Sequence, residues 1–490
     1  MSRHLQVRPG AYRDSVSLMQ VSQRVGAQPG VVSALVAMAT DLNLELLAGM
    51  GFSSPGGASA NDMLVAVEAV DDNALSAAVR QVDVILAERH APTGNGMGES
   101  PPRTIRAASP GATLALISTP GIHAAADAFE ALDAGLDVVI FSDNVPLAHE
   151  IALKRAAARR GRLVMGPDCG TAVVAGVGLG FANIVRPGPV GVVAASGTGA
   201  QQVMCLLDAA GVGVSHCLGV GGRDLSAAVG AASTLAALDL LAADATTERV
   251  LVVSKPPAAD VAALVRQQAS RLGLPVDFAL LGPDQPTLTD AVERVVRELG
   301  LPWPEPTAWP ALRARRPRAG ALRGLFAGGT LCDEAMLVAC ARLGPVRSNI
   351  PLEPDWRLRD DLRADGHVMI DFGDDRLTRG RPHPMIDNSL RAQRLVEEGA
   401  DPHCGVVLID VVLGHGAHPD PAAELGPAIH RARSTAASGG RDLAVVVSLV
   451  GTAADPQGLV HQAETLQTAG ASVHLSNAAA ARAAVELVGG

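Results

Sequence analysis

The chain alternates between short apolar runs and longer stretches whose apolar residues fall on one helical face, the pattern of an α/β protein. Its clearest example is the β-branched run Val190–Ala195, which leads through Ser196-Gly197-Thr198-Gly199 into a helical pattern over Gln201–Ala210. A strand, a turn of small residues and a helix start direct free backbone N–H groups and a positive dipole end at one point. The pattern predicts a phosphate or substrate site at this turn, with an ordinary strand-to-helix turn as the alternative.

The same kind of turn occurs a second time. The apolar residues Gly324-Leu325-Phe326-Ala327 are followed by Gly328-Gly329-Thr330. We therefore expect a second phosphate or substrate site at Gly328, Gly329 and Thr330. We also expect the segments around the two turns to be copies of one flavodoxin-like layout.

Further strands and helices alternate along the rest of the chain, which predicts parallel, doubly wound sheets. The expected strands include His4–Val7, Val31–Ala37, Met63–Val70, Thr113–Ser118, Val138–Ser142, Val250–Val253, Val406–Val412 and Ala444–Leu449. Ligands of such sheets bind beyond the carboxyl ends of the strands. This rule places Asp168 and Cys169, which follow the expected strand Leu163–Met165, at a ligand-binding edge.

Two segments rich in Gly and Pro divide the chain into parts. We predict a small N-terminal α/β unit (1–89), a linker (90–106), a Rossmann-type unit (107–186), a first flavodoxin-like unit (187–302), a Pro-rich linker (303–320) and a second flavodoxin-like unit (321–490). A chain of 490 residues is too long for one hydrophobic core.

Composition excludes several classes of partner. The net charge of −10 offers no basic surface for nucleic acid or an anionic membrane. No apolar run is long enough to span a bilayer without charges or helix breakers. The six cysteines are scattered, without a C-x-x-C pair, so we expect reduced thiols in a cytoplasmic protein.

A stiff, charged loop follows the acidic run Asp371–Asp375. Arg379 and Arg381 stand beside His383, and Pro382 and Pro384 restrict the backbone between them. Guanidinium groups offer forked donors, so the pattern predicts a clamp for phosphate or carboxylate, with Arg381 and His383 as catalytic candidates. The alternative is a solvated basic loop balanced by its acidic neighbours.

Three further side chains are candidates for chemistry. His415 and His418 follow the buried strand Val406–Val412, where a histidine could act as acid, base, phosphate carrier or metal ligand. Their spacing does not match H-E-x-x-H and no cysteine accompanies them, which argues against zinc, so no metal ligand is assigned. Each could also be an ordinary hydrogen-bonded loop histidine. At Cys169 a helix dipole could lower the pKa of the thiol, although a bystander role is the better interpretation.

Long, ordered motifs resemble those of the FdrA family, which is related to the succinyl-CoA synthetase α-subunit. The motifs are Phe141-Ser142-Asp143-Asn144-Val145, Met165-Gly166-Pro167-Asp168-Cys169-Gly170-Thr171-Ala172, Ala195-Ser196-Gly197-Thr198-Gly199, Gly221-Gly222-Arg223-Asp224-Leu225-Ser226, Ser254-Lys255-Pro256-Pro257 and Thr378 through Asp387. The resemblance implies a Rossmann-type, CoA-binding-like domain followed by two ligase-type flavodoxin-like domains. It also adds Asp168, Cys169, Gly221, Gly222 and Arg223 to the candidate phosphate or substrate contacts.

The resemblance also implies an activity. It points to a carbamoyltransferase subunit of the oxamate carbamoyltransferase type, which converts oxalurate and phosphate into oxamate and carbamoyl phosphate in allantoin and purine breakdown. Two further subunits are implied as partners, and a homo-oligomer is a further possibility. No cofactor is certain, and CoA, a nucleotide or Mg²⁺ are candidates.

Departures from the ligase pattern leave alternatives open. Ligase α-subunits of this type carry a phosphorylated histidine in a Gly-His-Ala-Gly-Ala segment, and this chain has no histidine between Ser254 and Gly300. Residues 1–89 stand in place of the Gly-rich CoA loop, and no ATP-grasp domain is present. The alternatives are an ADP-forming acyl-CoA synthetase with a separate nucleotide-binding subunit, in which His415 or His418 carries phosphate, and a non-catalytic scaffold subunit.

Overall fold

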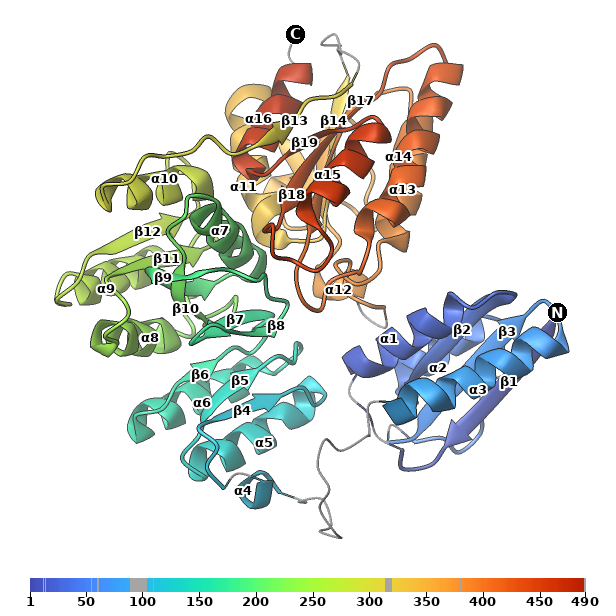
Figure 1. Cartoon of the computed structure of the whole chain (residues 1–490), viewed down its shortest axis with the longest axis horizontal. Helices are drawn as coiled ribbons and strands as arrows, with labels where there is room; N and C mark the ends of the chain where they lie inside the picture. The colour runs from blue at the N-terminus through green and yellow to red at the C-terminus, as the bar shows by residue number, and fades with distance from the viewer. Residues whose placement is uncertain are drawn as a thin grey trace. The chain divides into compact units, whose positions relative to one another are not determined.

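The computed structural model describes residues 1–11, 13, 15–53, 55–59, 61–88, 104–108, 110–312, 320–378 and 381–488. These residues form two compact units, one built on Met1–Ala108 and the other on Ser109–Thr378 with His383–Gly490 (Figure 1). Arg379, one of the predicted phosphate or substrate contacts, is not among the residues that the structure describes. The predicted boundaries between the parts of the second unit stay predictions.

The N-terminal unit is a three-stranded antiparallel sheet with helices on both faces. Its elements are β1 (Ser2–Arg8), α1 (Ser15–Gly26), β2 (Val31–Met38), α2 (Asp41–Gly49), β3 (Met63–Ala69) and α3 (Asp72–Glu88), followed by the short α4 (Ile105–Ala108). The strand order is β1-β3-β2, so β3 is central and buried along its whole length. Alternate residues of β3 pack on opposite faces: Val65 and Val67 join the core under α1 and α3, whereas Leu64 and Ala66 join a second core with Leu47 of α2.

The second unit begins with a small parallel sheet of Rossmann type. It contains β4 (Leu114–Ile117), α5 (Gly121–Asp133), β5 (Asp137–Ile140), α6 (Leu147–Arg160) and β6 (Val164–Met165), in the order β4-β5-β6. All of its strand pairs are parallel, as expected when helices connect consecutive strands.

The next sheet has four parallel strands and one antiparallel hairpin. Its elements are β7 (Thr171–Val174), β8 (Val177–Gly180), β9 (Pro187–Ala195), α7 (Gly197–Ala209), β10 (Val214–Gly219), α8 (Ala232–Ala243), β11 (Arg249–Ser254), α9 (Ala259–Ala269), β12 (Val276–Leu280) and α10 (Leu288–Glu298). The order β12-β11-β9-β10 places the first strand between the second and third, which is the flavodoxin-like arrangement. The hairpin β7–β8 extends this sheet beyond β10, although residues 171–180 were expected in the preceding unit.

The last sheet repeats the flavodoxin-like order. Its elements are β13 (Ala308–Trp309), β14 (Ala321–Phe326), α11 (Gly329–Leu343), β15 (Val346–Ser348), η1 (Pro354–Trp356), β16 (His367–Asp371), α12 (Asp375–Thr378), α13 (Ser389–Ala400), β17 (Cys404–Val412), α14 (Pro421–Ser438), β18 (Ala444–Val450), α15 (Leu459–Thr468), β19 (Ser472–His474) and α16 (Asn477–Val488). The order is β13-β19-β18-β17-β14-β16-β15, with α11 and α16 on one face and α13 and α14 on the other (Figure 1). The Pro-rich segment expected as a linker contributes β13, which pairs antiparallel with β19.

The predicted α/β class with parallel, Rossmann-like sheets is confirmed. In both flavodoxin-like sheets the strand order reverses at the first strand, β9 or β14. Crevices at such reversals are the usual ligand sites of open α/β sheets. The two predicted turns stand at these points, at the start of α7 and of α11.

Candidate functional site

The first turn closes β9 and opens α7. Ser196 is the N-cap residue, and its hydroxyl accepts a hydrogen bond from the Gly199 amide at 3.0 Å. The amides of Gly197 and Thr198 also lie in the first turn, where no helical carbonyl can accept from them. Ser196 and Thr198 are buried, whereas Gly197 is exposed, so one edge of this turn faces solvent.

The second turn is held by a buried ion pair. Asp410 of β17 accepts from the amides of Ala327 at 2.7 Å and Gly328 at 3.0 Å, and Arg391 of α13 donates to its Oδ1 at 2.6 Å. These contacts occupy the amides before the helix. The amides of Gly329 and Thr330, in the first turn of α11, lack helical acceptors in the same way as those of Gly197 and Thr198.

The two turns touch each other directly. The Ser196 hydroxyl donates to Thr330 Oγ1 at 2.6 Å across 134 residues of sequence. A Cβ added at Gly328 would lie 2.4 Å from Thr198 Oγ1, so only glycine allows this approach. The structure thus brings together Ser196–Gly199 and Gly328–Thr330, two helix N-termini with positive dipole ends. We call these two turns the twin-turn site.

Charged side chains surround the α11 turn. A Cβ added at Gly329 would lie 2.6 Å from both Lys255 Nζ and Asp371 Oδ2, so both groups lie directly beside this residue. Lys255 follows β11 and approaches Asp333 of α11 at 3.7 Å. Asp371 ends β16, and its Oδ1 accepts from the Gly373 amide at 2.9 Å.

The carboxyl groups of this cluster titrate near neutral pH. Burial raises the pKa of Asp371 to about 7 and that of Asp333 to about 6, and Lys255 opposes both shifts. Burial lowers the pKa of Lys255, but Asp333 and Asp371 outweigh it, so the net direction is upward and the ammonium stays charged. The site therefore combines a fixed positive charge with carboxyl groups that can hold or release a proton.

His383 belongs to the same cluster. A Cβ added at Gly373 would lie 2.9 Å from His383 Nε2, 3.1 Å from Asp371 Oδ1 and 2.6 Å from the Ala327 carbonyl. Burial and the charge of Arg391 lower the pKa of His383 to about 4, so the ring is neutral at pH 7. Its Nδ1 accepts from the Met385 amide at 3.2 Å, which assigns the proton to Nε2. His383 thus presents a donor toward Asp371 and the turn.

The other predicted catalytic residues lie outside this cluster of contacts. His415 is exposed, and its backbone forms a bridge with Ala182. His418 accepts from the Asp420 amide at 3.0 Å and approaches Glu424 at 3.5 Å, at the start of α14. Arg381 is exposed. The catalytic roles of these three residues stay predictions.

Asp168 and the Gly221 loop pack together at the end of β6. A Cβ added at Gly221 would lie 2.5 Å from the Pro167 carbonyl, so this glycine allows a close approach of two backbones. Gly222 is exposed. Arg223 forms an ion pair with Glu150 at 2.8 Å and donates a hydrogen bond to the Val145 carbonyl, also at 2.8 Å. Arg223 is thus tied to protein groups.

Desolvation and the charges of Asp375 and Asp143 raise the pKa of Asp168 to about 7. The Asp168 residue is itself exposed to solvent. The structure favours the bystander interpretation of Cys169, and its place among the candidate phosphate or substrate contacts stays a prediction. Burial and neighbouring Asp168 raise the pKa of its thiol to about 12, which rules out an activated thiolate.

Asp333, Asp371 and Asp410 were not among the predicted site residues. Lys255 precedes two prolines at the end of an expected strand, a position that suggests either an anion contact or a solvated side chain. Lys255 and Asp371 each stand at the carboxyl end of an apolar run, which is the signal that could have selected them. Asp410 stands inside such a run, and Asp333 inside a helix. Their roles depend on neighbours that are distant in the sequence.

Two family models match separate parts of the chain. A model described as "AllF, heavy metal-associated domain" matches residues 1–102, and a model described as CoA-ligase matches residues 325–487. The CoA-ligase match covers the α11 turn, Asp371 and His383. The chain is therefore an α/β protein with a CoA-ligase domain.

A relative defines the family more closely. The chain is 38% identical over 505 residues to the uncharacterized protein YahF of Escherichia coli K12, covering 96% of this chain and 95% of YahF. The chain belongs to the same family as YahF.

Similarity to curated enzymes is more local. The α-subunit of malate–CoA ligase from Methylorubrum extorquens is 30% identical over 172 residues, which cover 33% of this chain and 57% of that subunit. Among solved structures, a dinucleotide-forming acetyl-coenzyme A synthetase from Ca. Korarchaeum cryptofilum, in complex with phosphate and ADP, aligns with a TM-score of 0.31 and 16% identity, over 81% of this chain and 87% of that one.

Residues 1–102, which match the heavy metal-associated model, contain no thiolate ligand. Residues 1–102 include no cysteine, and soft metals are held in proteins mainly by thiolates. Within the described ranges, no group of three or more His, Cys, Asp or Glu residues could hold a metal ion. None of the helices in those ranges is long and apolar enough to cross a membrane.

Proposed function

We propose that the twin-turn site binds the phosphate of an acyl phosphate, and that the chain is the α-type subunit of an acid–CoA ligase. The observation that carries this proposal is the Ser196–Thr330 hydrogen bond, which couples the N-termini of α7 and α11 at 2.6 Å. The positive dipole ends of α7 and α11 then act on one anion, together with the Lys255 ammonium. The first-turn amides that can donate to it are those of Gly197, Thr198, Gly329 and Thr330. The CoA-ligase match over residues 325–487 supports this class.

The cluster suits acyl transfer between phosphate and a thiol. In that step the thiol sulfur attacks the acyl carbon, the bond from that carbon to the phosphate oxygen breaks, and inorganic phosphate leaves. Negative charge grows on the carbonyl oxygen and the phosphate, where fixed amides and an ammonium stabilise it. Asp371, whose pKa burial raises to about 7, accepts the thiol proton.

CoA would be the thiol substrate and a nucleotide-binding protein the partner. No residue of the described twin-turn site is assigned to a metal. Carboxylic acids such as malate and succinate are the natural first substrates to test, because the ligase subunits related to this chain are named for them.

Carbamoyl transfer is the second candidate function. His383 bears its proton on Nε2 and therefore donates there, which disfavours it as a phosphate carrier. No histidine stands between Ser254 and Gly300 to replace it. Attack of phosphate on the carbamoyl carbon of oxalurate releases oxamate and forms carbamoyl phosphate without a phosphohistidine, so it needs only the groups that are present.

Arsenolysis tests both candidates without a nucleotide-binding partner. Arsenate replaces phosphate, and its acyl or carbamoyl adducts hydrolyse at once. With malyl-CoA or succinyl-CoA, ligase activity releases free CoA, which a thiol reagent detects. With oxalurate, carbamoyl transfer releases ammonia.

We expect CoA release by the wild type and a loss of roughly tenfold or more in K255Q, which lacks the ammonium beside the anion. The matched control is R155Q, because Arg155 is exposed on α6 and should leave the rate unchanged. Ammonia release without CoA release would replace the first proposal by the second. Release that K255Q does not slow would remove the twin-turn site from either reaction.

A further inference from the structure

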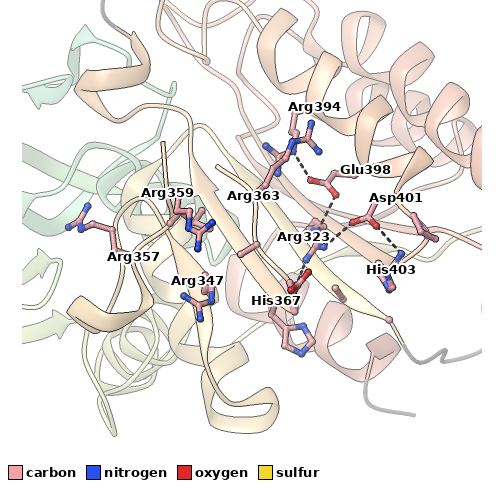
Figure 2. Close-up of a pocket in the computed structure, with 17 residues that line it drawn as sticks. Arg323, Arg347, Arg357, Arg359, Arg363, His367, Arg394, Glu398, Asp401 and His403 are labelled. Atoms are coloured by element: carbon pink, nitrogen blue, oxygen red, sulfur yellow. Dashed lines mark hydrogen bonds and ion pairs between the residues drawn. The ribbon is translucent and has the colours of Figure 1, made fainter. Parts of the chain in front are cut away.

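A pocket opens at the amino ends of strands β14 and β16. It has a volume of about 1010 Å³ and is lined by Ala321 and Arg323 at the start of β14 and by His367 at the start of β16 (Figure 2). The twin-turn site follows the other end of β14, after Phe326. Ala321 and Phe326 are five positions apart along this strand, a distance of roughly 17 Å. The pocket and the twin-turn site are therefore distinct.

Positive charge dominates this pocket. Its lining contains six arginines against three acidic residues. The arginines are Arg323, Arg347, Arg357, Arg359, Arg363 and Arg394, and the acidic residues are Asp365, Glu398 and Asp401. This local excess stands out in a chain with a net charge of −10.

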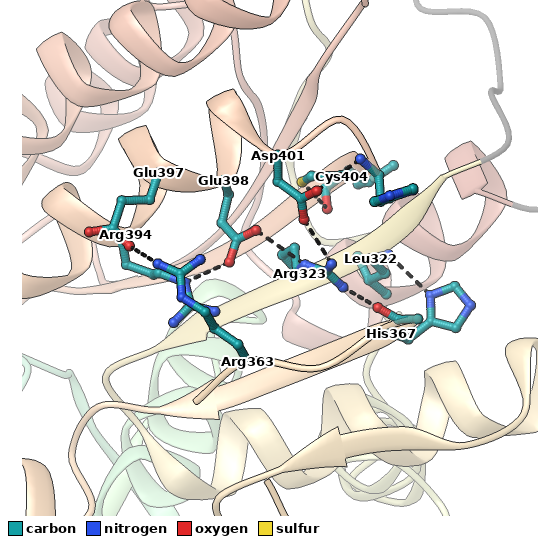
Figure 3. A network of polar contacts seen from close by, with 12 residues as sticks. Leu322, Arg323, Arg363, His367, Arg394, Glu397, Glu398, Asp401 and Cys404 are labelled. Atoms are coloured by element: carbon teal, nitrogen blue, oxygen red, sulfur yellow. Dashed lines mark hydrogen bonds and ion pairs between the residues drawn. The ribbon is translucent and has the colours of Figure 1, made fainter. Parts of the chain in front are cut away.

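The floor of the pocket is a closed ion-pair network (Figure 3). Arg323 is bound by Glu398 at 3.1 Å and by Asp401 at 2.9 Å, and Arg394 binds the other oxygen of Glu398 at 2.6 Å. The Arg323 side chain is only 6% exposed and that of Glu398 only 4%. These buried pairs use two of the three acidic groups and give the pocket a fixed base.

The rim carries arginines without such partners. Arg347 and Arg359 are exposed, and their side chains form no ion pair or hydrogen bond with any residue in the described part of the chain. Leu358, the residue before Arg359, is buried in the core, whereas Arg359 itself is exposed. In Figure 2 both guanidinium groups lie on the side of the pocket away from Asp401 and His403.

We propose that this arginine pocket binds a small molecule through two or more phosphate groups, such as a diphosphate or a nucleoside diphosphate. Forked guanidinium groups match phosphate oxygens in pairs, and several unneutralised charges suit a multiply charged anion better than a single carboxylate. The lining contains no Phe, Trp or Tyr, so beyond the small rings of His367 and His403 it offers no aromatic face for a base. The phosphates, not a base, are the recognised part.

His367 supplies an independent reporter of the bound charge. Its Nδ1 accepts from the Leu322 amide at 3.1 Å, which leaves Nε2 as the donor. Burial and the charge of Arg323 lower the pKa of His367, so the ring is neutral in the empty pocket. An anion beside it favours the charged form, so occupancy should raise this pKa.

Titration calorimetry with inorganic pyrophosphate tests the assignment on the full chain. R347Q/R359Q removes two exposed guanidinium groups without protein partners, so the fold should persist. R155Q/R271Q is the matched control, because it removes the same charge from exposed positions outside the pocket. K255Q removes the ammonium group of the twin-turn site and leaves the arginine pocket unchanged, so it shows whether pyrophosphate binds at the twin-turn site instead.

We expect R347Q/R359Q to weaken pyrophosphate binding by roughly tenfold or more, while R155Q/R271Q and K255Q retain it. In NMR titrations pyrophosphate should raise the pKa of His367 in the wild type and not in R347Q/R359Q. ADP should bind within a few-fold of pyrophosphate.

Three results would overturn the proposal. They are unchanged affinity in R347Q/R359Q, equal loss in R155Q/R271Q, and binding of ADP alone. Loss in K255Q with none in R347Q/R359Q would assign the pyrophosphate to the twin-turn site, leaving the arginine pocket without a ligand.

Discussion

At the residue scale, the α11 turn depends on one buried carboxylate. Asp410 is fully buried and binds two turn amides and Arg391, whose exposed fraction is only 1%. Removing one partner of such a pair typically costs about 3–5 kcal/mol, because the other charge stays buried. The pair thus fixes the turn where α11 begins, and with it the position of Gly329 beside Lys255 and Asp371.

His383 makes a pH-dependent contribution to stability that can be measured. Its pKa is lowered to about 4 in the folded chain, whereas an unfolded histidine titrates near 6.5. Between these values the unfolded state binds the extra proton, so stability falls as the pH drops from about 6.5 to about 4. The expected loss reaches ~3 kcal/mol for His383, and H383Q should not show it.

Urea unfolding of the wild type and H383Q at several pH values measures this difference. Asp371 works in the opposite direction: its raised pKa favours folding at low pH, and that contribution is lost as the pH rises toward about 7. Because Asp371 is present in both proteins, its effect cancels in the comparison. Parallel stability curves for the two proteins between pH 4 and 6.5 would contradict the neutral, buried state of His383.

At the element scale, Gly199 in the first turn of α7 and Gly329 in the first turn of α11 leave no room for a side chain. The G329A variant would place a methyl group 2.6 Å from both Lys255 Nζ and Asp371 Oδ2. We expect it to weaken phosphate binding at the twin-turn site by roughly tenfold or more, since the ammonium must move away. The measurement is phosphate affinity by calorimetry, with K255Q as a reference for loss.

G273A is the matched control for this prediction. A Cβ at Gly273 meets no atom within 4 Å, and the residue is exposed. This variant should bind phosphate as the wild type does. Normal phosphate affinity in a folded G329A protein would mean that the anion does not use the α11 turn.

Local patterns predicted the elements, whereas the contacts between them needed the fold. The turns Ser196–Gly199 and Gly328–Thr330 could be identified because a strand, a turn and a helix start are neighbours in sequence. The placement of Lys255 and Asp371 beside Gly329 depends on the pairing of β9 with β11 and of β14 with β16. No local pattern carries that information.

Two further features depend on contacts that are distant in the sequence. Ala308–Trp309 has a Pro-rich sequence typical of a linker, but pairing with β19 makes it an edge strand, where proline is tolerated nearby. Cys169 stands on a glycine-flanked turn that suggested an activated thiol. Packing against Gly219 and the hairpin β7–β8 buries it, and burial raises its pKa instead.

At the scale of the whole molecule, the two proposed anion-binding sites, the twin-turn site and the arginine pocket, lie at opposite ends of the strands of the last sheet. The twin-turn site stands at the carboxyl ends of these strands, and the arginine pocket at their amino ends. Parallel strands place all ends of one kind together, so the two sites do not compete for the same loops. Strands β14 and β16 connect them through the buried core, which allows a ligand at one end to be tested for an effect at the other.

The N-terminal unit provides the last prediction, because its family model is named for heavy metals while its sequence contains no thiolate ligand. The first cysteine of the chain is Cys169, outside the matched residues 1–102. Among the remaining thiols, burial raises the pKa of Cys205, Cys217, Cys332 and Cys404, which disfavours the thiolate that a metal requires. We expect no stoichiometric binding of Zn²⁺ or Cu⁺ when the reduced full chain competes with a chromophoric chelator. A chain that lacks residues 1–88 should behave identically. One equivalent of metal that binds the full chain and is lost with this deletion would show that the unit holds metal through ligands other than cysteine.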